Sequence, residues 1–149
     1  MTKTNVIKPC KEAMLVCDSI ITEAATNKKS LIGIFEEITC GKLPFRHDSL
    51  SVYVKFTGAL GDYEFKLELI DLHTNETIGR GSMRGPISIK DKLASFELVF
   101  NLRGLMFKHA GKFEFRIYAN EDVFATKTFT VFHQPAGQSG QAEPPPQPL

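Results

Sequence analysis

The sequence contains no tryptophan and only three cysteines among its 149 residues. These cysteines, Cys10, Cys17 and Cys40, form an odd set without a CxxC pair. Such a set indicates neither a disulfide framework nor a zinc knuckle. We therefore expect three reduced thiols in a cytoplasmic protein. In the absence of tryptophan, the twelve phenylalanines must supply the large aromatic side chains of the core.

Long apolar runs are absent as well. The start of the chain lacks the basic residues and the continuous apolar stretch of a signal peptide, since Asp18 interrupts the one candidate run and Lys11 and Glu12 precede it. No window approaches the roughly 20 apolar residues that cross a bilayer. The net charge of +1 gives no global attraction to nucleic acid or to an anionic membrane. We expect a soluble chain that binds neither.

Motifs of catalysis are also missing. The chain has no GxSxG or HExxH arrangement that would place a nucleophile or a metal beside a base. The segment Gly79–Gly85 has the spacing GxGxxxG, but it lies among predicted strands and no helix-forming run follows it. It is interpreted as a bulged or twisted strand that leads into a turn. We therefore expect no enzyme and no cofactor.

The chain does have apolar residues at every second position through most of its length. A period of two is typical of a strand with one buried face, and turn residues separate the runs. Eight strands are predicted, over residues 13–22, 31–40, 50–57, 63–70, 77–84, 96–102, 113–118 and 123–133. Strands at this spacing without helices predict an all-β fold, an antiparallel β-sandwich.

Composition divides the chain into three parts. Residues 1–11 are predicted to be an N-terminal extension, and residues 12–133 form the sandwich domain. Residues 134–149 are rich in proline, glycine and glutamine, and such a segment cannot bury enough apolar surface to offset its ordering entropy. We expect a disordered tail. Within the domain, Lys127 falls on the core face of its strand, which favours an edge position for Val123–His133.

Histidines and cysteines suggest one candidate metal site. If consecutive strands alternate in direction, the loops that follow residues 40, 72 and 103 share one pole of the sandwich. The side chains then expected at that pole are His47, His73, His109, His133, Cys10 and Cys40. Zinc requires three or four such ligands around one point. The alternative interpretation is that these are solvated residues of polar loops.

Four strings carry a resemblance to a known family. They are Met14-Leu15-Val16-Cys17-Asp18, Lys29-Ser30-Leu31-Ile32-Gly33-Ile34-Phe35, Tyr63-Glu64-Phe65-Lys66-Leu67-Glu68-Leu69 and Gly111-Lys112-Phe113-Glu114-Phe115-Arg116-Ile117-Tyr118-Ala119-Asn120. Together they resemble a family of small, uncharacterised bacterial proteins from about Ala13 to Val131. The resemblance implies an immunoglobulin-like sandwich in a bacterial cytoplasm. It implies no activity, cofactor or site residue.

Three hypotheses about function follow. The first is a non-enzymatic module that binds another protein through loops at one pole or through the edge near Val123–His133. The second is a metal-binding protein or metalloenzyme that uses the histidine-rich pole. The third is a structural or assembly protein that acts as a homo-oligomer.

Overall fold

The computed structural model describes residues 7–135, which form β-strands and the turns between them. The prediction of an all-β chain is confirmed, but the described residues form eleven strands where eight were expected. The strands are β1 (Cys10–Thr22), β2 (Lys29–Ile34), β3 (Glu37–Cys40), β4 (Phe45–Thr57), β5 (Gly61–Tyr63), β6 (Phe65–Asp71), β7 (Thr77–Ser82), β8 (Ile87–Ile89), β9 (Phe96–Phe107), β10 (Gly111–Ala119) and β11 (Asp122–His133).

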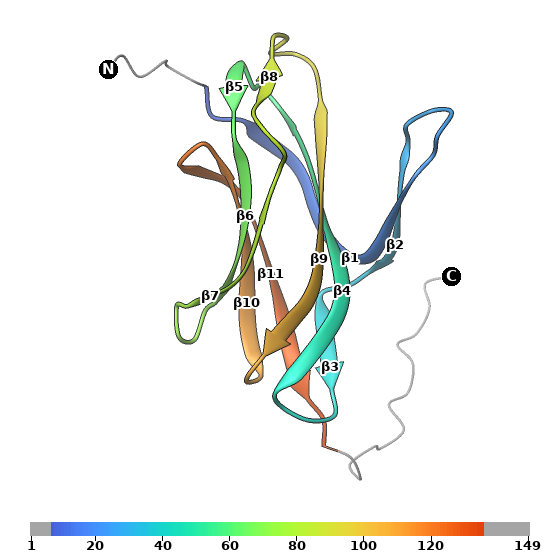
Figure 1. The fold of residues 1–149 in the computed structure, drawn as a ribbon, viewed down its shortest axis with the longest axis vertical. Helices are drawn as coiled ribbons and strands as arrows, with labels where there is room; N and C mark the ends of the chain where they lie inside the picture. The colour runs from blue at the N-terminus through green and yellow to red at the C-terminus, as the bar shows by residue number, and fades with distance from the viewer. Residues whose placement is uncertain (1–6, 136–149) are drawn as a thin grey trace.

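Two larger sheets form the body of the molecule (Figure 1). The first sheet has the order β2-β1-β4-β9, and the second has the order β3-β11-β10-β6-β7. A third, two-stranded sheet pairs β5 with β8. One cluster of buried side chains joins the two larger sheets, with Val52 and Leu98 from the first and Leu67 and Phe115 from the second. The core therefore lies between two layers.

Phenylalanine dominates this core, as the composition predicts. Phe113 and Phe115 both stack on Phe129, with ring centroids 5.9 and 5.4 Å apart. Burial of one such side chain contributes about 1.5 to 3 kcal/mol to stability. The fully buried phenylalanines are Phe56, Phe65, Phe107, Phe113, Phe115 and Phe129.

A glycine in the left-handed region explains why β9 is longer than predicted. Leu98, Phe100 and Leu102 occupy core positions, so the buried side chains fall on even-numbered residues. Gly104 then adopts a φ of 65°, and beyond it the buried residues are Leu105 and Phe107. The alternation changes phase at this point without ending the strand. A prediction that follows strict alternation therefore stops at residue 102.

The predicted strand 31–40 is divided in two. β2 ends at Ile34, just after Gly33 with its φ of 70°, and β3 begins at Glu37. The two strands belong to different sheets. Residues 31–40 thus carry the chain from the first sheet to the second, and β3 arrives parallel to β11. The prediction of purely antiparallel sheets is wrong at this pair.

The predicted edge position of Val123–His133 is wrong for the last four residues. β11 lies between β10 and β3, and Thr130–His133 pair with β3, whereas the residues before them pair with β10 alone. Lys127 does occupy the core phase, opposite the buried Phe115. It lies in the part of β11 without a β3 partner, and its side chain reaches outward to Glu36, with Nζ 2.9 Å from Oε1 and 2.8 Å from Oε2.

The glycine-rich segment is structural, as the sequence indicates. Gly79 and Gly81 belong to β7. A Cβ atom on Gly79 would lie 2.9 Å from Cδ2 of Leu105, and one on Gly81 would lie 3.5 Å from Cδ2 of Leu102. The missing side chains let β7 approach β9 closely.

Two further predictions concern the ends of the chain and the membrane. β1 begins at Cys10, inside the segment that the composition assigns to an extension. The predicted tail lies, apart from residues 134 and 135, outside the described residues. Among residues 7–135, no helix is long and apolar enough to cross a membrane.

Candidate functional site

Five of the six predicted metal-site residues lie at the same pole of the sandwich. His47 lies near the start of β4, His73 follows β6 and His109 follows β9. Cys40 and His133 are the last residues of β3 and β11. Cys10 does not join them, because it pairs with Thr57, at the far end of β4 from His47. The prediction for Cys10 is wrong because residues 31–40, expected as one strand, belong to two strands, β2 and β3. The additional strand reverses the direction of β1 relative to the prediction, so β1 begins at the opposite pole.

The five residues at the pole do not come together in one cluster. The ring of His47 packs against Phe35 and Phe45, with centroid distances of 6.2 and 6.0 Å. The rings of His73 and His109 are neighbours, with centroids 5.5 Å apart. His133 and Cys40 are register partners of β11 and β3. Among the described residues, no three His, Cys, Asp or Glu side chains lie close enough to hold a metal ion. The pole thus offers one pair of histidines and no ligand cluster.

Asp71 organises the turn that carries His73. Its Oδ1 accepts hydrogen bonds from the backbone N–H groups of His73 at 2.9 Å and Thr74 at 3.4 Å. Its Oδ2 lies 2.5 Å from Nε2 of His109, in the turn between β9 and β10. On its other side, Nδ1 of His109 lies 2.9 Å from the carbonyl oxygen of Ala110. The ion pair therefore ties the β6–β7 turn to the β9–β10 turn.

The surroundings favour the charged forms of both partners. The carbonyl of Ala110 and the Asp71 carboxylate raise the pKa of His109 against a smaller effect of desolvation. Burial by itself raises the pKa of Asp71, but the two backbone N–H groups and His109 together lower it below its ordinary value. Nδ1 of His109 faces the carbonyl oxygen of Ala110, and Nε2 lies at ion-pair distance from Asp71. A protonated His109 paired with Asp71 has no lone pair to offer to a metal.

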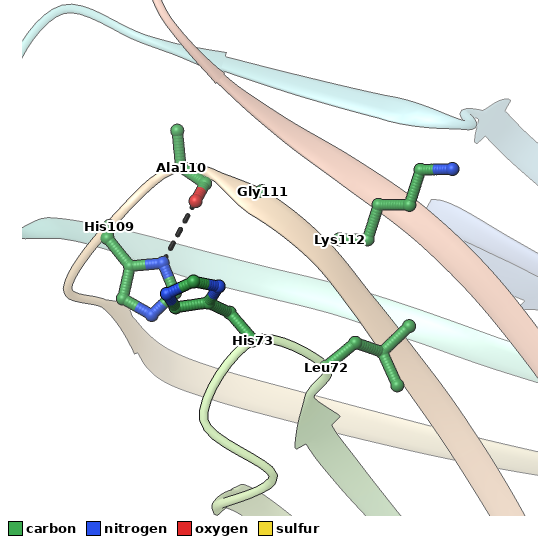
Figure 2. Close-up of a pocket in the computed structure, with 6 residues that line it drawn as sticks. All are labelled: Leu72, His73, His109, Ala110, Gly111 and Lys112. Atoms are coloured by element: carbon green, nitrogen blue, oxygen red, sulfur yellow. Dashed lines mark hydrogen bonds between the residues drawn. The ribbon is translucent and has the colours of Figure 1, made fainter.

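A shallow pocket of about 690 Å³ lies beside this pair (Figure 2). Its lining residues are Leu72, His73, His109, Ala110, Gly111 and Lys112. None of these six side chains is a hydroxyl or a thiol. The structure supports a stabilising role for Asp71 and His109 and leaves the pocket without evident chemistry.

A second candidate site is a hairpin that projects from the sandwich. The last part of β1 and all of β2, residues 18–34, extend away from the two layers (Figure 1); we call this hairpin the arm. Three large apolar side chains of the arm are exposed, with exposed fractions of 54% for Ile21, 46% for Ile32 and 53% for Ile34. None of these three isoleucines belongs to the hydrophobic core.

Strand pairing places the three isoleucines on one face of the arm. Ile21 pairs with Ser30, Ser19 pairs with Ile32, and Cys17 pairs with Ile34. Directly paired residues point to the same face of a sheet, and so do residues two apart in one strand. The isoleucines therefore form a continuous row that ends at Cys17, which is buried where the arm leaves the sandwich.

A cleft separates the tip of the arm from the first sheet. It has a volume of about 560 Å³, and it is lined by residues 26–29 of the arm together with Lys55, Ser95 and Glu97. On the outer face of this sheet, Tyr53 donates a hydrogen bond from its hydroxyl to Glu97. Burial, followed by the bond and the charge of Glu97, raises the pKa of Tyr53. The hydroxyl of Tyr53 thus has its hydrogen-bond partner within the sheet, and the isoleucine row remains exposed.

Sequence reasoning missed the arm. Residues 13–22 and 31–40 were interpreted as strands contacted on both faces because both are rich in isoleucine, leucine and valine. Polar residues inside these runs were the available signal. Asp18 is exposed, and a Cβ atom on Gly33 would lie 2.2 Å from its Oδ2. A charged side chain that fills the space beside a glycine indicates a strand that has left the core.

Comparison with known proteins gives one family match. The family described as "Family of unknown function (DUF6941)" matches residues 12–132 of this chain. No curated protein matches the chain.

Solved structures show only a distant likeness. A β-glucosidase from Listeria innocua is 10% identical with a TM-score of 0.43, and 84% of this chain covers 16% of that one. The same enzyme in complex with isofagomine is 9% identical with a TM-score of 0.41, and 84% of this chain covers 17% of it. A mutant of this enzyme in complex with laminaribiose is 12% identical with a TM-score of 0.42, and 83% of this chain covers 17% of it. This chain therefore spans less than a fifth of the length of each of these β-glucosidase chains.

Proposed function

Because the chain belongs to the family of unknown function DUF6941, its role must be inferred from its own surface, and we propose that it is a non-enzymatic module that binds another protein through the arm. The row of Ile21, Ile32 and Ile34 carries this proposal. Contiguous exposed apolar side chains are typical of interaction surfaces. A hairpin that extends from a rigid sandwich can present such a row to a partner.

The arm replaces both surfaces that the sequence suggested. The edge near Val123–His133 is covered by β3 over its last four residues. At the histidine pole, the loops are tied together by the pair of Asp71 and His109. The metal hypothesis has less support than the binding hypothesis, since both nitrogens of His109 face oxygen atoms.

We also infer an immunoglobulin-like topology and a bacterial, cytoplasmic setting. The parallel pairing of β3 with β11, beside the antiparallel pairs β1–β4 and β4–β9, supports the first inference. The three free thiols support a reducing compartment. The bacterial setting rests on the family resemblance of the four sequence strings.

Chemical cross-linking in cells tests the proposed function. An amine-reactive cross-linker is applied to cells that express the tagged full chain, and mass spectrometry identifies the cross-linked peptides. Lys28 is exposed and Lys29 is half-buried at the tip of the arm, so we expect the links to other polypeptides to concentrate there. Lys90 and Lys92, in the exposed turn before β9, serve as internal controls.

Substitution of the row completes this test. Ile32→Lys should abolish the links from Lys28 and Lys29, because it places a charge in the centre of the apolar row. Leu93→Lys is the matched control, since Leu93 is 90% exposed and lies outside the arm. Links spread evenly over all exposed lysines, or unchanged in Ile32→Lys, would show that the arm is not a docking surface.

A further inference from the structure

We propose that the occupant of the isoleucine row is the same row on a second copy of this chain, packed antiparallel about a two-fold axis. The proposal rests on the proposed function, since it names the partner of the same arm. In a two-fold interface the same surface of both copies is used, so that a contact of residue i with residue j is repeated as a contact of j with i. The surface must therefore be complementary to itself. The arm meets this condition in both its apolar and its charged residues.

The apolar part of the condition concerns the centre of the arm. Ile32 lies between Ile34 on its own strand and Ser30, which pairs with Ile21. No charged residue interrupts the row, because Ser19 and Ser30 are its only polar members beyond Cys17. A two-fold axis near Ile32 therefore places Ile32 against Ile32 of the second copy, and it brings Ile34 of each copy to the level of Ile21 and Ser30 of the other. Burial of such side chains drives association.

The charged part concerns the two ends of the arm. The tip carries Lys28 and Lys29 against one acid, Glu23, which leaves one net positive charge. The base carries Asp18, Glu36 and Glu37, and Lys127 neutralises Glu36 through their ion pair, which leaves two net negative charges. An antiparallel arrangement brings the tip of each arm to the base of the other. Both ends of the interface then pair opposite charges, whereas a parallel arrangement would repel.

The isoleucines are available to a second copy, because their side chains are 46 to 54% exposed in the single chain. Isolated two-stranded hairpins are marginally stable in water, so packing against another arm would also stabilise the hairpin itself.

Sedimentation equilibrium of the purified full chain tests the proposal. We expect a reversible monomer–dimer equilibrium for the wild type and monomer alone for Ile32→Lys at the same concentrations. Leu93→Lys should dimerise like the wild type. A wild type that stays monomeric up to its solubility limit overturns the proposal, and so does an Ile32→Lys variant that dimerises normally. Circular dichroism confirms that each variant is folded.

Charge reversal tests the antiparallel orientation. Lys28→Glu makes both ends of the arm negative, and Glu37→Lys makes the base neutral, so each variant alone should form an antiparallel dimer severalfold more weakly than the wild type. In a parallel dimer Lys28→Glu would only replace one pair of like charges at the tips by another, and the dimer would not weaken. An equimolar mixture should recover the dimer, because the positive tip of one variant then meets the negative base of the other. Native mass spectrometry distinguishes the mixed dimer by its mass. Equal amounts of mixed and unmixed dimers would exclude the proposed orientation.

Two outcomes separate this inference from the proposed function. If purified protein is monomeric but Lys28 cross-links to a different polypeptide in cells, the arm is a docking surface for another protein and the second copy is excluded. If neither self-association nor arm cross-links are found, both proposals fail. Concentration-dependent hydrogen exchange of residues 29–34 gives an independent readout, since dimerisation should slow it and leave β10 unaffected.

Discussion

At the scale of the residue, the pair of Asp71 and His109 makes stability depend on pH. The pKa of His109 is raised above its ordinary value of 6.5, so its contribution is complete below that pH and is lost as pH rises through the folded-state pKa. The pKa of Asp71 is lowered from 3.8, so its contribution is complete above that pH and is lost on acidification. The pair stabilises the fold most between these values.

His109→Gln should remove the alkaline part of this dependence. The glutamine has no titrating group, so the free energy of unfolding should no longer fall as pH rises through the pKa of His109. Asp71→Asn should weaken it only in part, because the carbonyl of Ala110 still raises the pKa of His109, while Oδ1 at position 71 still accepts from the backbone of His73 and Thr74. Urea denaturation at a series of pH values measures the effect. An unchanged alkaline slope in His109→Gln would contradict the assignment.

Gly79 tests close packing at the same scale. Gly79→Ala places a methyl group 2.9 Å from Cδ2 of the buried Leu105, and overpacking of this kind typically costs about 1 to 3 kcal/mol. Gly41→Ala is the matched control, because a Cβ atom there meets nothing within 4 Å. Chemical denaturation compares the two. Equal stabilities would mean that β7 can move away from β9 without loss.

At the scale of the element, the arm should be the least protected pair of strands in dilute protein. β1 pairs with β4 only up to Cys17, so residues 18–34 form a hairpin of two strands. β10, in contrast, pairs on both sides and carries the buried Phe113, Phe115 and Ile117. Strands with few buried contacts open more readily.

Hydrogen exchange of monomeric protein measures this difference. We expect the amides of residues 29–34 to exchange through local opening, at rates insensitive to substitutions that destabilise the core. Amides of β10 should exchange only through global unfolding. Exchange of both segments with the same free energy would show that the arm is an integral part of the sandwich.

At the scale of the whole molecule, the three thiols report global unfolding. Cys10 is exposed, whereas Cys17 and Cys40 are buried. Burial, with the charge of Asp18, also raises the pKa of Cys17, and the thiolate is the reactive form. A disulfide reagent should therefore titrate one thiol in native protein and three in urea. Fast reaction of a second thiol under native conditions would contradict the packing around β1 or β3.

The alternation of side chains was sufficient to predict the class of fold. Every second residue is apolar in segments such as Phe96–Leu102 and Phe113–Ile117, and these residues do form the core. The pattern is local, because a strand with one buried face requires it wherever its neighbours lie. The phenylalanine-rich core follows from composition for the same reason. The shared pole of four histidines follows from strand direction alone.

Tertiary structure alone decided the remaining features. Gly104 shifts the phase of β9 through a backbone conformation that composition does not reveal. The path of residues 31–40 from one sheet to the other placed Cys10 at the far pole and covered β11 with β3. The exposure of Ile21, Ile32 and Ile34 has the same origin, because an apolar side chain is buried only if another layer reaches it. Which layer reaches which strand depends on contacts between residues distant in sequence, and no local pattern encodes them.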